Sequence, residues 1–375
     1  MEIPMPPYPH LFSSFDLAGI PLANRVVMAP MTRSRATRRA EGNIPTDLMA
    51  EYYGARADAG LIITEGVAPG RNGLGYPRIP GIYSDAQVAG WRKVADAVHR
   101  SGPAKIFMQL MHSGRIFHPL NLPDGGVGVA PSAIAAPGEM YTDEEGPQPH
   151  PAPHAMSEAQ IHAAIDDFVS AAKNAVAAGI DGVELHGANG YLIDQFLNPI
   201  TNQRTDGWGG SAEARNRFAV EVARRTADAI GAGRTGIRLS PYGAFNGLGH
   251  HDGEDAQFTQ LAAELGGLGL AYIHIVDHSA MGAPEVPQSV KDAIRGAFGG
   301  TIILSGGYDA ARAEADLAVG KGELVAFGRP FIANPDLVTR LAHDLPMNAP
   351  DPSTFYSAGA KGYTDYPRAP AAATA

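Results

Sequence analysis

The chain has 375 residues, of which 45% are hydrophobic and 18% charged, an ordinary globular composition that can bury a substantial core. A net charge of −10 argues against nucleic-acid or anionic-membrane partners, and the lack of cysteine excludes disulfides, thiolate zinc sites, iron–sulfur clusters and a cysteine nucleophile. With no signal-peptide pattern and no apolar stretch near the ~18 residues of a membrane span, we expect a cytoplasmic protein.

Short apolar runs of strand-forming residues alternate with amphipathic stretches along the chain. The predicted strands are Arg25–Met31, Leu61–Glu65, Lys105–Leu110, Gly182–His186, Gly236–Leu239, Tyr272–Val276, Thr301–Leu304 and Leu324–Phe327. The predicted helices are Thr46–Ala59, Asp85–Arg100, Ser157–Ala178, Ala212–Ile230, Asp255–Leu268, Val286–Ala297, Asp309–Ala318 and Pro335–His343. Eight such α/β units most simply close into a (β/α)8 TIM barrel.

Residue types at the ends of the helices support this division. Ser157 opens a Ser-x-x-Gln capping box, and Thr46 and Asp85 stand where N-caps are expected. Gly102 and Gly179 follow helices as C-terminal stops. A doubly wound open sheet is the competing architecture, but the first strand is not followed by its Gly-x-Gly-x-x-Gly turn.

The long loops follow strand ends, where the catalytic loops of a barrel lie. Residues 112–156 follow the third strand, and we interpret them as a capping segment over the barrel mouth. We find no linker, so residues 1–375 are expected to form one domain, in which 367–375 is a disordered tail. His150 and His154 have a metal-ligand spacing, but the prolines between them forbid a helix, so we predict no metal site. Trp91 and Trp208 are expected to be packing residues.

Three polar residues gather at the end of the fourth strand. His186 and Asn189 could hold a carbonyl oxygen and stabilise the negative charge that grows on it, and Tyr191 could deliver a proton. From the residues alone, a strand-end histidine with a polar loop remains an equal alternative.

The last two strands end in glycine. Gly306 and Gly307 follow the seventh strand, and Gly328 and Arg329 follow the eighth, which is the usual position of a phosphate site in a barrel. Tight turns without a ligand are the alternative. Arg238 lies inside the fifth strand, where it needs either an anionic ligand or a buried salt bridge, for example to Glu184 or Glu65.

These residues also carry a family resemblance. The segments Met28–Arg33, Ile63–Gly66, Gln109–Leu110, His186–Leu197, Arg238–Pro241 and Gly328–Pro330 resemble the Old Yellow Enzyme family, in particular its bacterial ene-reductases of the N-ethylmaleimide reductase and pentaerythritol tetranitrate reductase group. The likeness runs from about Leu11 to Tyr366 in the same order. It implies an FMN-dependent ene-reductase.

By this resemblance FMN lies across the barrel mouth. The FMN-binding residues would be Pro30, Met31, Thr32, Gly66, Gln109, Arg238, Gly306, Gly307, Gly328 and Arg329. The resemblance implies ping-pong chemistry: NADPH or NADH reduces the flavin, and an enone or nitroalkene then accepts a hydride from flavin N5. His186 and Asn189 would bind the substrate oxygen, and Tyr191 would supply the proton. Tyr76, Met111 and Tyr356 would line the substrate space.

One residue departs from the family pattern. Met111 stands where the family usually has tryptophan, which predicts a roomier pocket and an altered facial preference. A flavin-free aldolase or isomerase barrel is the rival function, but Lys105 lies at the wrong strand end for a Schiff base, and no pair of catalytic carboxylates is evident. The oligomeric state is expected to be a monomer or a small homo-oligomer.

Overall fold

Eight parallel strands close into a barrel in the computed structural model, which describes residues 7–370. The strands are β3 (Val26–Met28), β4 (Leu61–Val67), β5 (Lys105–Leu110), β10 (Gly182–Gly187), β11 (Thr235–Leu239), β12 (Tyr272–Ile275), β13 (Thr301–Leu304) and β14 (Leu324–Phe327). Each pairs in parallel with the next along the chain, and β14 pairs with β3 to close the circle. The predicted barrel is confirmed, with β3 shorter than expected at both ends.

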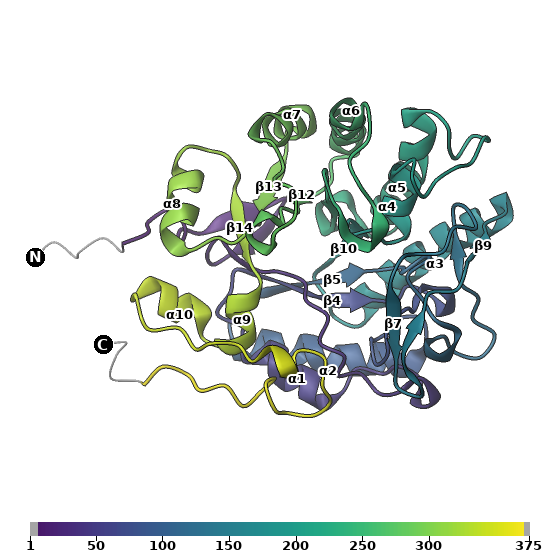
Figure 1. The fold of residues 1–375 in the computed structure, drawn as a ribbon. Helices are drawn as coiled ribbons and strands as arrows, with labels where there is room; N and C mark the ends of the chain where they lie inside the picture. The colour runs from purple at the N-terminus through teal and green to yellow at the C-terminus, as the bar shows by residue number, and fades with distance from the viewer. Residues whose placement is uncertain (1–6, 371–375) are drawn as a thin grey trace, which may run out of the picture.

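Helices surround these strands (Figure 1). They are α1 (Asp47–Gly54), α2 (Asp85–Ser101), α3 (Glu158–Ala177), α5 (Ala212–Ile230), α6 (Glu254–Gly267), α7 (Gln288–Phe298), α8 (Ala310–Ala318) and α10 (Leu337–Ala342). Two short helices that the sequence analysis did not predict, α4 (Leu192–Leu197) and α9 (Arg329–Ala333), directly follow the loops after β10 and β14. The prediction that the first helix reaches Ala59 was wrong, because α1 ends at Gly54.

The residues predicted to cap or stop the helices are found in those places except at two positions. Ser157 forms the expected capping box, but α2 is capped by Ser84, whose Oγ accepts a hydrogen bond from the backbone N–H of Gln87. Asp85 is therefore the first helical residue and not the cap. Thr46 occupies the N-cap position of α1, yet its hydroxyl donates to the carbonyl oxygen of Arg35 and does not cap the helix.

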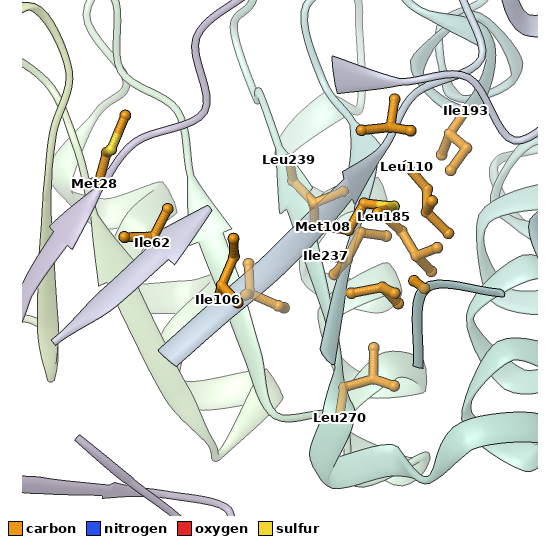
Figure 2. Close-up of a cluster of buried hydrophobic side chains, with 14 of the residues drawn as sticks. Met28, Ile62, Ile106, Met108, Leu110, Leu185, Ile193, Ile237, Leu239 and Leu270 are labelled. Carbon is orange, nitrogen blue, oxygen red and sulfur yellow. The ribbon is translucent and has the colours of Figure 1, made fainter. Parts of the chain in front are cut away.

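Alternation along the strands divides the core into two layers. Outward side chains such as Met28, Ile106 and Leu185 pack against the surrounding helices, as Figure 2 shows for one part of this layer. Inward side chains such as Leu61 and Phe107 fill the barrel. No helix within residues 7–370 is long and apolar enough to cross a membrane.

A hairpin that the sequence analysis missed closes the far end of the barrel. Strands β1 (Phe15–Leu17) and β2 (Ile20–Leu22) pair antiparallel, and Leu17 and Leu22 pack among the inward side chains. Because Leu61, the first residue of β4, belongs to the same cluster, the hairpin lies at the N-terminal ends of the strands. The C-terminal ends are left for the functional site.

The segment between β5 and α3 contains two small sheets. Strands β7 (Glu139–Thr142) and β8 (Gly146–Pro149) form an antiparallel hairpin. Strands β6 (Val129–Ala130) and β9 (His154–Ala155) pair in parallel beside it. Figure 1 shows β7 and β9 together on one side of the molecule, away from α8 and α10.

Two hydrogen bonds involve the start of the segment that is expected to be a disordered tail. Arg368 donates to the carbonyl oxygen of Ala55 at 2.7 Å, and the backbone N–H of Ala369 donates to Asp336 at 2.6 Å. These two bonds join residues 368 and 369 to the end of α1 and to the start of α10, and the disordered tail over 367–375 stays a prediction. Residues 371–375 lie outside the described part of the chain.

Candidate active site

Two adjoining cavities open where the barrel strands end. The first, of about 600 Å³, is the glycine-lined cavity, and the second, of about 850 Å³, is the tyrosine-lined cavity. They share Pro30, Thr32, Asn189, Arg238 and Tyr356. The glycine-lined cavity also includes Met31, Gly306, Gly307, Gly328 and Arg329, and the tyrosine-lined cavity also includes Tyr76, Gln109, Met111, His186 and Tyr191. Of the predicted site residues, Gly66 lies outside both linings.

Arg238 is a buried cation that forms no salt bridge within the described part of the chain. Its Nε is buried and has no hydrogen-bond partner within residues 7–370. Glu184, the expected salt-bridge partner, instead accepts bonds from Gln109, Tyr272 and His274 at 2.8, 3.2 and 2.9 Å. The alternative of a buried salt bridge therefore does not hold within the described residues. Burial lowers the pKa of the Arg238 guanidinium, as expected for a cation that lacks a bound anion.

Glu184 also fixes the orientation of the Gln109 amide. Because Gln109 Nε2 donates to the Glu184 carboxylate, Gln109 Oε1 is left as an acceptor beside the tyrosine-lined cavity. An acceptor at this place can bind a ligand N–H group.

His186 is an uncharged imidazole beside Arg238. The two residues are paired in register on β10 and β11. Burial lowers the pKa of His186 well below its usual value, and the nearby charge of Arg238 lowers it further. His186 Nδ1 has no hydrogen-bond partner within the described chain. The ring can therefore donate one neutral hydrogen bond to a ligand.

Two phenols meet on the same wall of the tyrosine-lined cavity. The hydroxyl oxygens of Tyr76 and Tyr191 are 3.0 Å apart, and either can donate to the other. The Tyr191 ring packs edge-on against His186, with centroids 4.9 Å apart. Burial raises the pKa of both phenols, Tyr191 well above its usual value, so both hold their protons at neutral pH.

The loop that carries Asn189 is held by residues the sequence analysis missed. Asn189 has a φ of 59°, and its backbone N–H donates to Ser240 Oγ at 2.9 Å. Ser240 in turn donates to Asp194 at 3.0 Å. Asn246 Nδ2 donates to the Asn189 carbonyl oxygen at 2.8 Å, and His278 Nε2 lies 3.0 Å from Asn189 Oδ1. His278 follows β12 closely, so its position just after a predicted strand was a signal that could have identified it.

The glycines after β13 have positive φ angles and lie too close to their neighbours for a side chain. Gly307 has a φ of 67°, and a Cβ added there would lie 2.5 Å from the Cβ of Ala280. Gly328 is the residue before α9, and Arg329 is its first helical residue. Gly306, Gly307, Gly328 and Arg329 line the same cavity, and backbone N–H groups with one guanidinium are a donor set suited to phosphate.

Gly66 packs closely against Met111 and lies outside both cavity linings. Pairing between β4 and β5 is irregular between Ile63 and Gly66. A Cβ added at Gly66 would lie 2.5 Å from Met111 Sδ. Gly66 thus makes room for the Met111 side chain, which is 1% exposed and forms part of the wall beside Tyr76 and Tyr191.

Two distant segments complete the tyrosine-lined cavity. Met140 of β7 lies in its wall. Tyr356, which is 63% exposed, belongs to the segment that follows α10. Two buried arginines bind the backbone of this segment. Arg33 donates to the carbonyl oxygens of Phe355 and Gly362, and Arg35 to those of Thr354 and Phe355, among others.

The other histidine and tryptophan residues singled out in the sequence lie outside both cavity linings. His150 Nδ1 lies 3.2 Å from the carbonyl oxygen of Phe117, and His154 is exposed on β9. Residues 7–370 contain no group of three or more His, Cys, Asp or Glu side chains placed to hold a metal ion. Trp91 and Trp208 are both buried in the core, as predicted.

Comparison with known proteins gives consistent matches over nearly the whole chain. Residues 10–348 match the model of the NADH:flavin oxidoreductase / NADH oxidase family, a family of FMN-dependent enzymes. Chanoclavine-I aldehyde reductase of Penicillium roqueforti is 44% identical over 95% of this chain and 95% of its own length. A probable flavin mononucleotide-dependent alkene reductase of Leishmania infantum is 39% identical, covering 94% and 95%.

Solved structures agree. Morphinone reductase, as the N189A mutant in complex with tetrahydroNAD, superposes with a TM-score of 0.91 at 44% identity, covering 97% of this chain and 98% of that one. An Old Yellow Enzyme homologue from Zymomonas mobilis gives a TM-score of 0.89 at 39% identity, covering 96% and 99%. The chain therefore belongs to the Old Yellow Enzyme family of FMN-dependent oxidoreductases, as its motifs predicted.

Proposed function

We propose that this protein is an NAD(P)H-dependent ene-reductase that reduces the C=C bond of α,β-unsaturated carbonyl and nitro compounds by a ping-pong mechanism. The observation that carries this proposal is that His186, Asn189 and Tyr191 line one cavity together with Arg238, whose Nε has no hydrogen-bond partner among residues 7–370. The alkene reductase from Leishmania infantum supports the reaction class. FMN, when bound, accepts a hydride from the nicotinamide and passes it to the alkene.

The residues present fit FMN on structural grounds. Arg238 is a buried cation without a salt bridge among the described residues, and Gln109 offers a hydrogen-bond acceptor to the cavity that both residues line. We assign these two to the flavin ring system, together with Pro30, Met31 and Thr32. We assign Gly306, Gly307, Gly328 and Arg329 to the phosphate, because they surround the end of the cavity where a Cβ at Gly307 would not fit. Gly66 is assigned an indirect role, through Met111.

His186 and Asn189 would bind the substrate oxygen. Each can donate a hydrogen bond without carrying charge, because His186 is neutral and Asn189 is an amide. Donors fixed in place before the reaction stabilise the negative charge that develops on a carbonyl or nitro oxygen as the alkene accepts a hydride. Tyr76, Met111 and Tyr356 shape the space around that substrate.

Tyr191 would give a proton to the α-carbon. A phenol with a raised pKa holds its proton until carbanion character develops beside it. When Tyr76 donates its own hydroxyl to the Tyr191 oxygen, the Tyr191 proton is free for the substrate, and the bond stabilises the phenolate that remains. The alkene thus gains a hydride at the β-carbon and a proton at the α-carbon.

NADPH and NADH both remain candidate reductants, and nitroesters are further candidate substrates. We also propose that the protein works in the cytoplasm as a monomer or a small homo-oligomer.

An anaerobic absorbance titration tests the function. The purified protein should be yellow, should bleach with NADPH or NADH, and should regain its colour with 2-cyclohexenone. Bleaching without recovery on 2-cyclohexenone or on a nitroalkene would contradict the alkene reductase function. A colourless protein that FMN cannot reconstitute would contradict the cofactor.

A further inference from the structure

Asn189 uses nearly all its polar groups in contacts with the protein. Its backbone N–H is bound to Ser240, its carbonyl oxygen to Asn246, and its Oδ1 lies 3.0 Å from His278 Nε2. Asn189 Nδ2 has no bond within residues 7–370, and the residue lines both cavities. The surroundings of Asn189 therefore leave the amide donor for a ligand and occupy the amide acceptor.

His278 is suited to occupy that acceptor. Oδ1 of an amide only accepts, so the bond requires a proton on His278 Nε2. Burial, reinforced by the charge of Arg238, lowers the pKa of His278 to about 4, so the ring is neutral near pH 7. A neutral imidazole keeps one N–H group, which can be the one at Nε2. The ring is also supported from one side by Phe245, edge-on at 4.7 Å between centroids. Its Nε2 is thus held in position against the amide.

The contact matters because the two ends of an amide are nearly equal in size and opposite in hydrogen bonding. Even with the backbone held at a φ of 59°, the Asn189 amide can make a half-turn about its last side-chain bond. That half-turn would direct the Asn189 oxygen toward the carbonyl or nitro oxygen of a substrate. Two acceptors facing each other repel, so binding would weaken.

We propose that His278 is a positioning residue that locks the Asn189 amide with its NH2 group toward the substrate oxygen. His278 acts through Asn189, so this inference rests on the role proposed for Asn189 above. It adds a selection rule to the site: a ligand group that faces Asn189 must be a hydrogen-bond acceptor.

The test is a double-mutant cycle on the FMN-loaded enzyme. Cyclohexanone, which has the acceptor oxygen but no alkene, is titrated while its dissociation constant is read from the flavin absorbance. His278→Phe keeps a ring beside Phe245 and removes the donor, whereas His278→Gln places an amide NH2 group near the position of Nε2. We expect His278→Phe to weaken binding about five- to tenfold, which matches the loss of one hydrogen bond, and His278→Gln to restore it to within about twofold.

The same change in an Asn189→Ala background decides the mechanism. If His278 acts through the Asn189 amide, His278→Phe should change cyclohexanone binding by less than about twofold there. An equal weakening in both backgrounds, or no weakening with Asn189 intact, would overturn the inference. If His278→Phe releases FMN, the cycle is repeated with the smaller His278→Leu, which also lacks a donor.

The failure of the inference and that of the proposed site can be separated. If Asn189→Ala binds cyclohexanone as tightly as the unchanged enzyme, the role proposed for Asn189 is wrong and the inference falls with it. If Asn189→Ala binds weakly and His278→Phe does not, only the inference is wrong.

Discussion

Replacing Tyr191 by phenylalanine should separate the two half-reactions. The substitution removes one hydroxyl and its 3.0 Å bond to Tyr76, while the ring can keep its edge-on packing against His186. The structural cost should be about 1 kcal/mol, the usual net value of one hydrogen bond. A positioned acid is worth roughly 10²–10⁴ in rate, so alkene reduction should slow by that factor, about 2.7–5.5 kcal/mol in the barrier.

Stopped-flow absorbance measures each half-reaction separately. The rate of flavin bleaching by NADPH should change by less than about twofold, because no proton from Tyr191 is needed there. The rate at which 2-cyclohexenone restores the flavin colour should fall by the full factor. Equal losses in both steps would show that Tyr191 positions ligands generally. Unchanged reoxidation would show that another acid, or solvent, supplies the proton.

Three further substitutions test other parts of the site. Gly307→Ala should weaken FMN binding about tenfold, measured as FMN retained on dialysis, because the new Cβ would lie 2.5 Å from that of Ala280; normal retention would argue against the phosphate cradle. Met111→Trp should reduce the space beside the substrate and change product stereochemistry across substituted enones, and identical stereochemistry would refute the assigned role. Burial raises the pKa of Asp194 from 3.8 to about 7. The contribution of the protonated side chain to folding stability is therefore complete below pH 3.8, and it is lost as the pH rises from there through 7. In urea unfolding, the native protein should therefore lose about 2 kcal/mol relative to Asp194→Asn between about pH 5.5 and 7, at roughly 1.4 kcal/mol per pH unit, and parallel pH curves would contradict this.

Features that depend on local sequence were predictable. The strands of the barrel are short apolar runs of strand-forming residues that alternate with amphipathic helical stretches, and this alternation located all eight. Because all barrel strands are parallel, residues at their C-terminal ends must meet at one end. Sequence position alone therefore brought His186, Arg238 and Gly307 to one pair of cavities.

Features that depend on distant partners were not predictable. The β1–β2 hairpin has only three residues in each strand, which is too few for a clear pattern. It is stabilised by the packing of its apolar side chains against the inward side chains at the N-terminal end of the barrel. The segment around Tyr356 is held by Arg33 and Arg35, more than 300 positions earlier, through backbone carbonyl oxygens that any residue offers. Such contacts leave no signal in residue types.

The buried charge of Arg238 explains why uncharged hydrogen-bond donors suit the tyrosine-lined cavity, where the substrate is proposed to bind. Arg238 already places one buried cation at the junction of the cavities, and a second cation nearby would be repelled and poorly solvated. Burial and Arg238 together keep His186 and His278 uncharged, so each gives a hydrogen bond without adding to that repulsion. A lysine at either position would compete with Arg238 for the same anionic ligand. In the proposed site, an imidazole and an amide would polarise the substrate oxygen and leave the full charge of Arg238 to the cofactor.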